Sequence, residues 1–222
     1  MNKNIVLLGS SSELASEFTN INSSNNIFQI SSTGVDLKNS NNLLINNYID
    51  DAEDIVNFIS KINSPILIFF NGYLKENRPT QEPSFEQISK TIEANYFVPY
   101  TVTNKLLENN VSIKKFIFIS SFAATKVRYK NFIYGYSKKL LEESIKSLKI
   151  ENFLIIRFGK VNTSLSKGHK NTVFDLSKNQ AAKFIHSNFE RKSGIIYSSK
   201  FLYFISRIFL ITPNYLLKKF NI

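Results

Sequence analysis

Three side chains of this sequence could take part in proton transfer: the phenol of Tyr134, the ammonium of Lys138 and the hydroxyl of Ser121. The segment FIYGYSKKLLEESIKSL around the first two reads as a helix, where a spacing of four residues places both on one face. An ammonium within about 4–6 Å favours the phenolate. We therefore expect Lys138 to lower the pKa of Tyr134 from about 10 toward neutral pH, where a general acid or base is most effective. The spacing alone is weak, because a lysine-rich chain with ten tyrosines contains it by chance.

A succession of apolar runs and helical stretches would position these side chains. Five runs rich in Val, Ile, Leu and Phe predict strands: Asn4–Gly9, Ile27–Ser31, Ile66–Phe70, Lys115–Ser120 and Phe153–Phe158. The stretches between them predict helices: Ser12–Asn20, Ala52–Ile62, Phe85–Leu107 and Ile133–Leu148. Continuous apolar runs are typical of parallel strands covered on both faces. The sequence thus predicts an α/β fold with a doubly wound parallel sheet, whose ligands bind beyond the carboxyl ends of the strands.

The first turn of the chain has the composition of a phosphate-binding turn. Leu8-Gly9-Ser10-Ser11-Ser12-Glu13-Leu14-Ala15 directly follows the first predicted strand. Gly9 permits a tight exit, and the serine hydroxyls and backbone amides could hold a pyrophosphate at the positive end of the helix dipole. Ser10 and Glu13 also fit a capping box, so an ordinary helix start is the alternative.

Composition narrows the class of protein. The formal net charge is +11, but the basic residues are spread along the chain without an arginine-rich arm, so we expect no nucleic-acid partner. Without cysteine there is no thiolate catalysis and no disulfide, which fits a cytoplasmic protein. His169 and His186, the only histidines, lack partners at ligand spacing, so we expect both at the surface and no metal site. The apolar start leads into a glycine-serine turn and reads as a strand rather than a signal peptide.

Six motifs in order give the chain a family resemblance. From Ile5 to about Thr163 it resembles the short-chain dehydrogenase/reductase superfamily in its classical single-domain form. The matching positions are the turn at Gly9–Ala15, Asn71-Gly72, Asn95, Ser120-Ser121, Tyr134 with Lys138, and the segment from Arg157 through Gly159 to Thr163. The resemblance implies a Rossmann-type fold and an oxidoreductase that uses NADP, with NAD as the alternative, on a small carbonyl or alcohol substrate.

The resemblance also implies roles for individual residues. Tyr134 would donate a proton to a carbonyl oxygen and Ser121 would hydrogen-bond the same oxygen. Lys138 would bind the nicotinamide ribose, and Asn95 would hold a water in the proton relay. Cofactor contacts are expected from Gly9, Ser10, Ser11, Ser12, Glu13, Leu14, Ser32, Thr33, Asp50, Asn71, Gly72, Tyr134, Lys138, Gly159, Val161 and Thr163.

Several positions depart from the family pattern. Glu13 and Ala15 replace two glycines of the turn, so the backbone approaches a pyrophosphate less closely and a carboxylate is added beside it. Phe158 replaces a proline before Gly159. At the end of the second strand, hydroxyls at Ser32 and Thr33 favour NADP over NAD, although Asp36 nearby could reverse that choice. The region 27–50 leaves room for little or no helix before the third strand.

Two loops and the carboxyl-terminal stretch bear on the substrate. The loops 122–130 and 164–170 contain basic and no acidic residues, which favours a phosphate-bearing substrate unless these lysines are only solvated. Residues 199–222 form an apolar and basic segment after a domain of residues 1–198. Its apolar run Phe201–Ile211 is too short to span a bilayer. It could lie against a membrane, with Lys218 and Lys219 toward anionic head groups, or at a subunit interface; the interface is favoured because members of the superfamily commonly form oligomers.

The resemblance extends loosely to reductases of polyprenyl-phosphate-linked or nucleotide-linked keto-sugars in bacterial envelope polysaccharide synthesis. It rests on the basic loops, the tail and the Ser-Glu-Leu-Ala form of the turn. A general carbonyl or 3-oxoacyl reductase is the alternative enzyme, and a non-catalytic NADP-sensing protein is the alternative outside the enzymes. Retention of Ser121, Tyr134 and Lys138 favours an enzyme.

Overall fold

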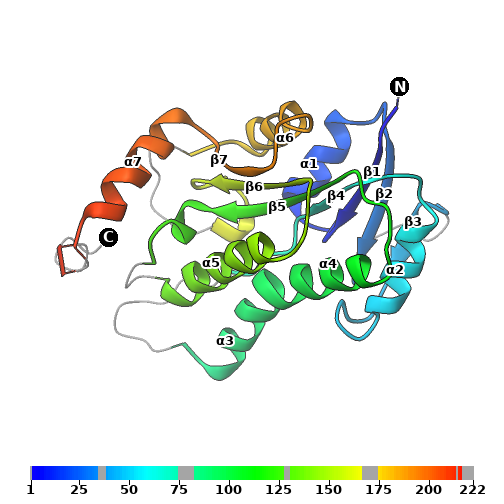
Figure 1. Ribbon diagram of the computed structural model, residues 1–222, viewed down its shortest axis with the longest axis horizontal. Helices are drawn as coiled ribbons and strands as arrows, with labels where there is room; N and C mark the ends of the chain where they lie inside the picture. The colour runs from blue at the N-terminus through cyan, green and yellow to red at the C-terminus, as the bar shows by residue number, and fades with distance from the viewer. Residues whose placement is uncertain are drawn as a thin grey trace.

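A single parallel sheet forms the centre of the computed structural model, which describes residues 2–34, 39–74, 83–127, 131–166, 175–213 and 215–216. Its strand order is β3-β2-β1-β4-β5-β6-β7, and all paired strands run parallel (Figure 1). The strands are β1 (Asn4–Leu8), β2 (Asn26–Ser31), β3 (Asn42–Leu44), β4 (Ile66–Phe69), β5 (Lys115–Ser121), β6 (Phe153–Phe158) and β7 (Gly194–Tyr197).

Helices cover both faces of the sheet. They are α1 (Glu13–Ile21), α2 (Ala52–Ser60), α3 (Phe85–Ile92), α4 (Val98–Glu108), α5 (Phe132–Ser147), α6 (Lys178–Ser187) and α7 (Lys200–Ile211). Short turns of other helix types are η1 (Glu93–Phe97), η2 (Phe122–Ala124) and η3 (Ser164–Ser166). In Figure 1, α1 and α6 lie above the sheet, α2 to α5 lie below it, and α7 extends from the β7 end.

The residues of β1 show why the sheet is apolar on both faces. Ile5 and Leu7 belong to the core formed with α1 and α6, whereas Val6 and Leu8 belong to the core formed with α2, α4 and α5. All four side chains are fully buried. Because successive strand residues point to opposite faces, a strand covered on both sides must be apolar throughout. The predicted doubly wound α/β sheet is confirmed.

The five predicted strands correspond to β1, β2, β4, β5 and β6, each within one residue at either end. The prediction expected a third strand before Asp50 without giving bounds for β3, and it missed the edge strand β7 and the helix α6. It also merged α3 and α4 into one helix, which the π-helical turn η1 interrupts. Between β2 and β3, residues 32–34 and 39–41 contain no helix, as the short sequence there indicated.

The start of α1 differs from the predicted capping box. Ser12 is the N-cap, and its hydroxyl accepts a hydrogen bond from the Ala15 backbone N–H at 3.2 Å. The box of Ser10 and Glu13 is wrong, because Ser10 is buried inside the turn and Glu13 already belongs to the first helical turn. The serine hydroxyls of this turn therefore differ in role: that of Ser12 caps α1, whereas that of Ser10 is buried.

Candidate functional site

A cavity of about 910 Å³ opens at the carboxyl ends of the strands. Its walls come from the turn after β1, the ends of β4, β5 and β6, the first turn of α5 and one face of α7. This is the edge at which doubly wound sheets bind ligands.

Most of the predicted site residues line this cavity: Gly9, Ser11, Ser12, Glu13, Leu14, Ser32, Asn71, Gly72, Ser121, Tyr134, Gly159, Val161 and Thr163. Ser10, Asn95 and Lys138 are buried and do not contribute to its lining. Thr33 and Asp50 are exposed and do not line it either.

Ser121 and Tyr134 meet because α5 passes close to the turn that follows β5. Ser121 ends β5 and caps η2, with its Oγ accepting from the Ala123 N–H at 3.2 Å. A Cβ on Gly135 would lie only 3.2 Å from the Ala123 carbonyl oxygen, so the helix approaches the turn more closely than most residues would permit. Burial raises the pKa of Tyr134, and its hydrogen bond with Ser121 acts in the opposite direction. The phenol is therefore protonated at neutral pH.

Lys138 lies one turn further along α5 and points toward the ends of two strands. Its Nζ donates to the Ile119 carbonyl at 3.0 Å and to the Asn71 carbonyl at 3.4 Å. Burial lowers the pKa of Lys138 to about 8, against the nearby Glu142 carboxylate, which raises it. The expected lowering of the Tyr134 pKa by Lys138 is wrong, because burial raises that pKa and the lowering contribution comes from Ser121 instead.

Asn95 lies in the π-helical turn η1, a type of turn that is frequent at functional sites. Its Nδ2 donates to the Tyr73 carbonyl at 2.7 Å, and its Oδ1 accepts from the Tyr73 N–H at 3.2 Å. A Cβ on Gly72 would lie 3.5 Å from Asn95 Oδ1 and 3.9 Å from Lys138 Nζ. Asn95 and Lys138 thus flank the same small space beside Gly72.

A buried ion pair supports this region from below. Glu142, fully buried on α5, receives hydrogen bonds from Arg157 of β6, including one from Nε at 3.0 Å, and from the Ser120 hydroxyl at 2.5 Å. Arg157 also donates to the Tyr197 hydroxyl at 2.5 Å and to Thr125 Oγ1 at 3.3 Å. Sequence reasoning missed this network. The available signal was Arg157, a charged residue inside the otherwise apolar run of β6.

The turn after β1 is built around Gly9. Its φ is +78°, and a Cβ there would lie 2.8 Å from the Asn71 backbone nitrogen, so only glycine allows the ends of β1 and β4 to approach. The Ser31 hydroxyl donates to Ser11 Oγ at 2.9 Å. Among the residues that the structure describes, none forms a hydrogen bond with the buried Ser10 Oγ.

Glu13 reaches across the cavity rim from α1. Its Oε1 accepts from the Ser164 backbone N–H at 2.6 Å, and its Oε2 accepts from Lys178 Nζ at 2.9 Å. These hydrogen bonds lower the pKa of Glu13 to about 2. The carboxylate therefore stays ionised at all ordinary pH values.

Tyr48, rather than Asp50, is directed to the cavity at the β2 side. The Asp50 backbone N–H donates to Asn47 Oδ1 at 3.2 Å within an exposed turn. Tyr48 lines the cavity, and its hydroxyl donates to the Ile30 carbonyl at 3.4 Å. The expectation for Asp50 came from the family resemblance, whereas in this structure Tyr48 of the same turn lines the cavity.

The basic loops are only partly described by the structure. Lys126 does not point to the cavity, because its Nζ donates to the carbonyls of Leu210 and Thr212 at the end of α7. The other basic side chains expected near a substrate lie outside the described residues: Arg128, Lys130, Lys167, His169 and Lys170. Asp36 lies outside them too.

One face of α7 completes the cavity. Leu202, Ile205 and Phe209 line it, and the Phe209 ring meets the Phe122 ring edge-on at a centroid distance of 5.3 Å. This wall is apolar, in contrast to the hydroxyl-rich wall at the turn after β1.

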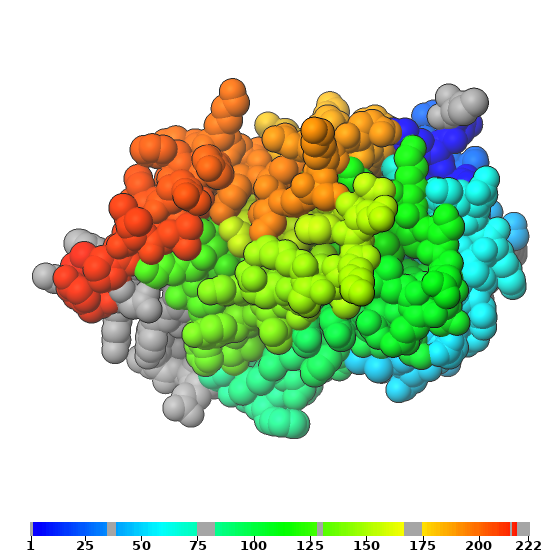
Figure 2. Space-filling view, viewed as in Figure 1, coloured from blue at the N-terminus to red at the C-terminus, as the bar shows by residue number. Residues whose placement is uncertain are grey.

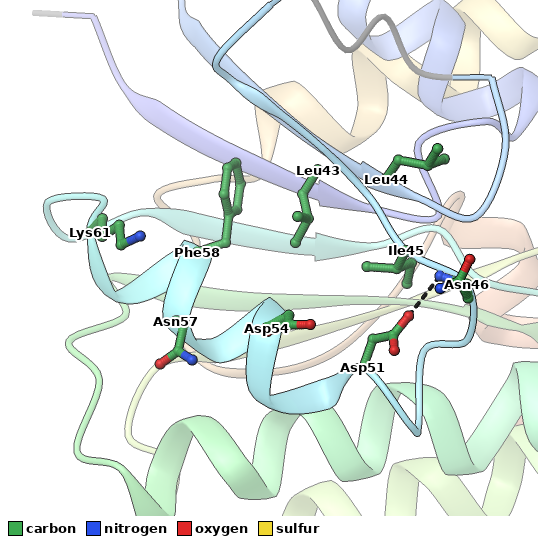
Figure 3. Close-up of a pocket in the computed structure, with 9 residues that line it drawn as sticks. All are labelled: Leu43, Leu44, Ile45, Asn46, Asp51, Asp54, Asn57, Phe58 and Lys61. Carbon is green, nitrogen blue, oxygen red and sulfur yellow. Dashed lines mark hydrogen bonds between the residues drawn. The ribbon is translucent and has the colours of Figure 1, made fainter.

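A second cavity of about 440 Å³ lies between β3 and α2 (Figure 3). Asp51 there accepts a hydrogen bond from the Asn46 N–H at 2.6 Å. This cavity contains none of the predicted site residues.

Two further expectations concern metal and membrane. His186 is exposed, as expected. Among the described residues, no three His, Cys, Asp or Glu side chains gather as a metal site would require. Within the same ranges, no helix combines the length and the apolar character needed to cross a bilayer.

Comparison with solved structures places the fold. A short-chain dehydrogenase from Burkholderia cenocepacia J2315 in complex with NADP superposes with a TM-score of 0.74 at 13% identity, and 95% of each chain is covered. The carbonyl reductase Sniffer of D. melanogaster gives 0.71 at 18% identity, covering 89% of this chain and 97% of its own. Thermoplasma acidophilum aldohexose dehydrogenase gives 0.70 at 14% identity, covering 88% and 92%. Neither a protein-family model nor a curated protein matches the sequence. Over nearly its whole length, the chain has the fold of the short-chain dehydrogenases/reductases.

Proposed function

We propose that this protein is an NADP-dependent oxidoreductase that reduces a carbonyl group. The observation that carries the proposal is the hydrogen-bonded pair of Ser121 and Tyr134 on the cavity wall, with Lys138 and Asn95 directly behind it at Gly72. A protonated phenol beside a second hydroxyl is what a ketone oxygen requires as it gains negative charge.

The cavity fits a dinucleotide. Gly9 lets the ends of β1 and β4 approach each other, and Ser11 and Ser12 of the same turn line the cavity where a pyrophosphate would lie. Ser32, at the end of β2, supplies a hydroxyl and no carboxylate to repel a 2′-phosphate. The structural neighbours from Burkholderia cenocepacia and Sphingobium yanoikuyae hold NADP and NADPH, which supports the same choice here, with NAD as the alternative.

The bound nicotinamide would supply the hydride. The protein's own groups would supply the proton and the orientation. The raised pKa of Tyr134 keeps the phenol protonated, which suits a proton donor in the direction of reduction. Ser121 would hold the carbonyl oxygen. Lys138, with a pKa of about 8, and Asn95 would pass the replacement proton through the space beside Gly72.

For the substrate, we propose a carbonyl compound with a phosphate-bearing or lipid-linked sugar, used in bacterial surface polysaccharide synthesis. The apolar wall of Leu202, Ile205 and Phe209 supports a substrate with an apolar portion. The same wall supports the alternative of a general carbonyl or 3-oxoacyl reductase. A non-catalytic NADP-sensing protein is the third possibility.

One experiment separates these functions. The purified protein is mixed with NADPH and a panel of keto-sugar phosphates, quinones and oxoacyl thioesters, and absorbance at the NADPH band is followed. Oxidation with a keto-sugar phosphate, lost in Tyr134→Phe while NADPH binding persists, supports the proposal. Tight NADPH binding without turnover of any substrate supports the sensor, and unchanged turnover in Tyr134→Phe refutes the proton donor.

We also propose that residues 199–222 are covered by a second copy of this chain in a homo-oligomer, with peripheral attachment to the cytoplasmic face of an anionic membrane as the alternative. The outer side of α7 exposes Phe204 (62%) and Ile211 (82%), and the helix stands at one end of the molecule (Figure 2). After Glu190 the chain contains six basic and no acidic residues. An apolar helix face beside cations favours anionic lipid.

A homo-oligomer interface is the favoured cover for α7, because an exposed apolar patch favours self-association. Sedimentation with phosphatidylglycerol vesicles, compared with phosphatidylcholine vesicles, tests the membrane. Binding to the anionic vesicles, lost in Phe204→Ser, supports the membrane alternative. A dimer in size-exclusion chromatography that Phe204→Ser dissociates, with no vesicle binding, supports the interface.

A further inference from the structure

Three positively polarised groups converge on one carboxylate at the rim of the cavity. The Ser164 backbone N–H, from the segment after β6, and the Lys178 ammonium, from α6, both bond Glu13. Glu13 itself lies in the first turn of α1, where the helix dipole favours negative charge. Both Glu13 and Ser164 line the cavity. A carboxylate thus occupies a site whose donors would serve a phosphate equally well.

The contact is built so that it can be exchanged. The Glu13 side chain is 37% exposed and the Lys178 side chain 41%. Both charges therefore remain in contact with solvent when the ion pair separates. An exposed ion pair of this kind contributes little to stability. A dinucleotide pyrophosphate that approaches the turn after Gly9 would meet the Glu13 carboxylate first, since Glu13 begins the helix that directly follows this turn.

We infer that Glu13 is a resident anion that competes with the cofactor pyrophosphate for Ser164 and Lys178, and that it sets a weak affinity for the dinucleotide. This inference rests on the proposed use of NADP. On binding, the carboxylate leaves Ser164 and Lys178, and the phosphate oxygens take their hydrogen bonds. The exchange involves only these hydrogen bonds, and no covalent bond forms or breaks.

The effect of removing the charge follows from its position. A carboxylate within roughly 6 Å of a phosphate, at an effective dielectric of about 40, changes a dissociation constant about tenfold. Glu13→Gln should therefore tighten NADPH binding about tenfold, as measured by NADPH fluorescence. Lys178→Met should weaken it, because it removes the cation and leaves the carboxylate uncompensated.

The matched control is Glu17→Gln. Glu17 lies one turn further along α1 and contacts α6 in a similar way, accepting from Asn179 Nδ2 at 2.6 Å. Since Glu17 does not line the cavity, its replacement should leave NADPH affinity unchanged.

Inorganic pyrophosphate, followed by the thermal shift it produces, separates this inference from the proposed function. Tighter binding of pyrophosphate by Glu13→Gln, with no NADPH or NADH binding by any variant, supports the resident anion and refutes the cofactor. Tighter binding of both supports both. If Glu13→Gln leaves pyrophosphate and NADPH binding unchanged or weakens them, the carboxylate is a clasp that holds the site together and the inference is overturned.

Discussion

Replacing Glu142 by glutamine tests whether the ion pair beneath the site stabilises the fold. Glu142 is fully buried, and the side chain of Arg157 is only 12% exposed. Removing one partner of a buried pair leaves an uncompensated charge and costs about 3–5 kcal/mol. Glutamine keeps an oxygen for the Ser120 hydroxyl, and Arg157 keeps Tyr197 and Thr125 as acceptors. We therefore expect a loss at the lower end, about 3 kcal/mol.

Urea unfolding measures that loss directly. For a chain of this size, about 3 kcal/mol corresponds to a decrease in Tm of roughly 6–12 °C. Glu143→Gln is the control, because Glu143 is the neighbouring residue, 56% exposed, in an ion pair with Lys146 on the helix surface. Its replacement should change the free energy of unfolding by about 0.5 kcal/mol or less.

The two outcomes that matter are easy to tell apart. If Glu142→Gln costs no more than Glu143→Gln, burial does not raise the value of this pair and the reasoning fails. A double variant, Glu142→Gln with Arg157→Met, should lose less than the sum of the two single variants, because neither charge is then left without its partner.

Three further predictions concern the cavity. Ser12→Ala should lower the free energy of unfolding by about 1 kcal/mol through loss of the helix cap. Ser10→Ala should be close to neutral, because its hydroxyl has no partner in the described part of the chain; urea unfolding measures both. Lys138 has a pKa of about 8 in the fold against 10.5 unfolded; between those pH values the unfolded chain binds the proton and the native protein does not. The free energy of unfolding of the protein should therefore rise between pH 8 and pH 10.5, by up to about 3 kcal/mol. Lys138→Met should remove that rise. Gly9→Ala should lower the free energy of unfolding by about 2 kcal/mol or more and abolish NADPH binding. The alanine would have to adopt a positive φ, and its Cβ would lie 2.8 Å from the Asn71 backbone nitrogen.

The strands that the sequence predicts well are the central ones. A strand covered on both faces has no room for polar residues, so its whole length is a continuous apolar run. The edge strands β3 and β7 are three and four residues long, and only one neighbour constrains them. Such strands leave too short a pattern to recognise. The break at η1 could not be predicted from the sequence either, because a π-helical turn has the same kinds of residue as the α-helices on either side of it.

The site is predictable where spacing along one element decides it. Tyr134 and Lys138 share α5, so their common face follows from helix geometry. The direction of the Tyr134 pKa shift does not, because burial of the phenol is its main cause, and that burial is set by the tertiary structure around α5. The contacts of Glu13 with residues more than 150 positions away are likewise set by tertiary structure.

The two walls of the cavity are held with unequal firmness. α5 is fixed at three successive turns: Gly135 contacts the turn after β5, Lys138 bonds the strand ends and Glu142 pairs with β6. α7 packs through one face only, with Leu202 and Ser206 buried and the Phe209 ring against Phe122, and its outer face is exposed. Because tight packing resists small displacements, a substitution in α7 should leave the position of the proton donor Tyr134 unchanged. Changes in α7 should therefore alter which substrate binds while the position of the reacting groups stays the same.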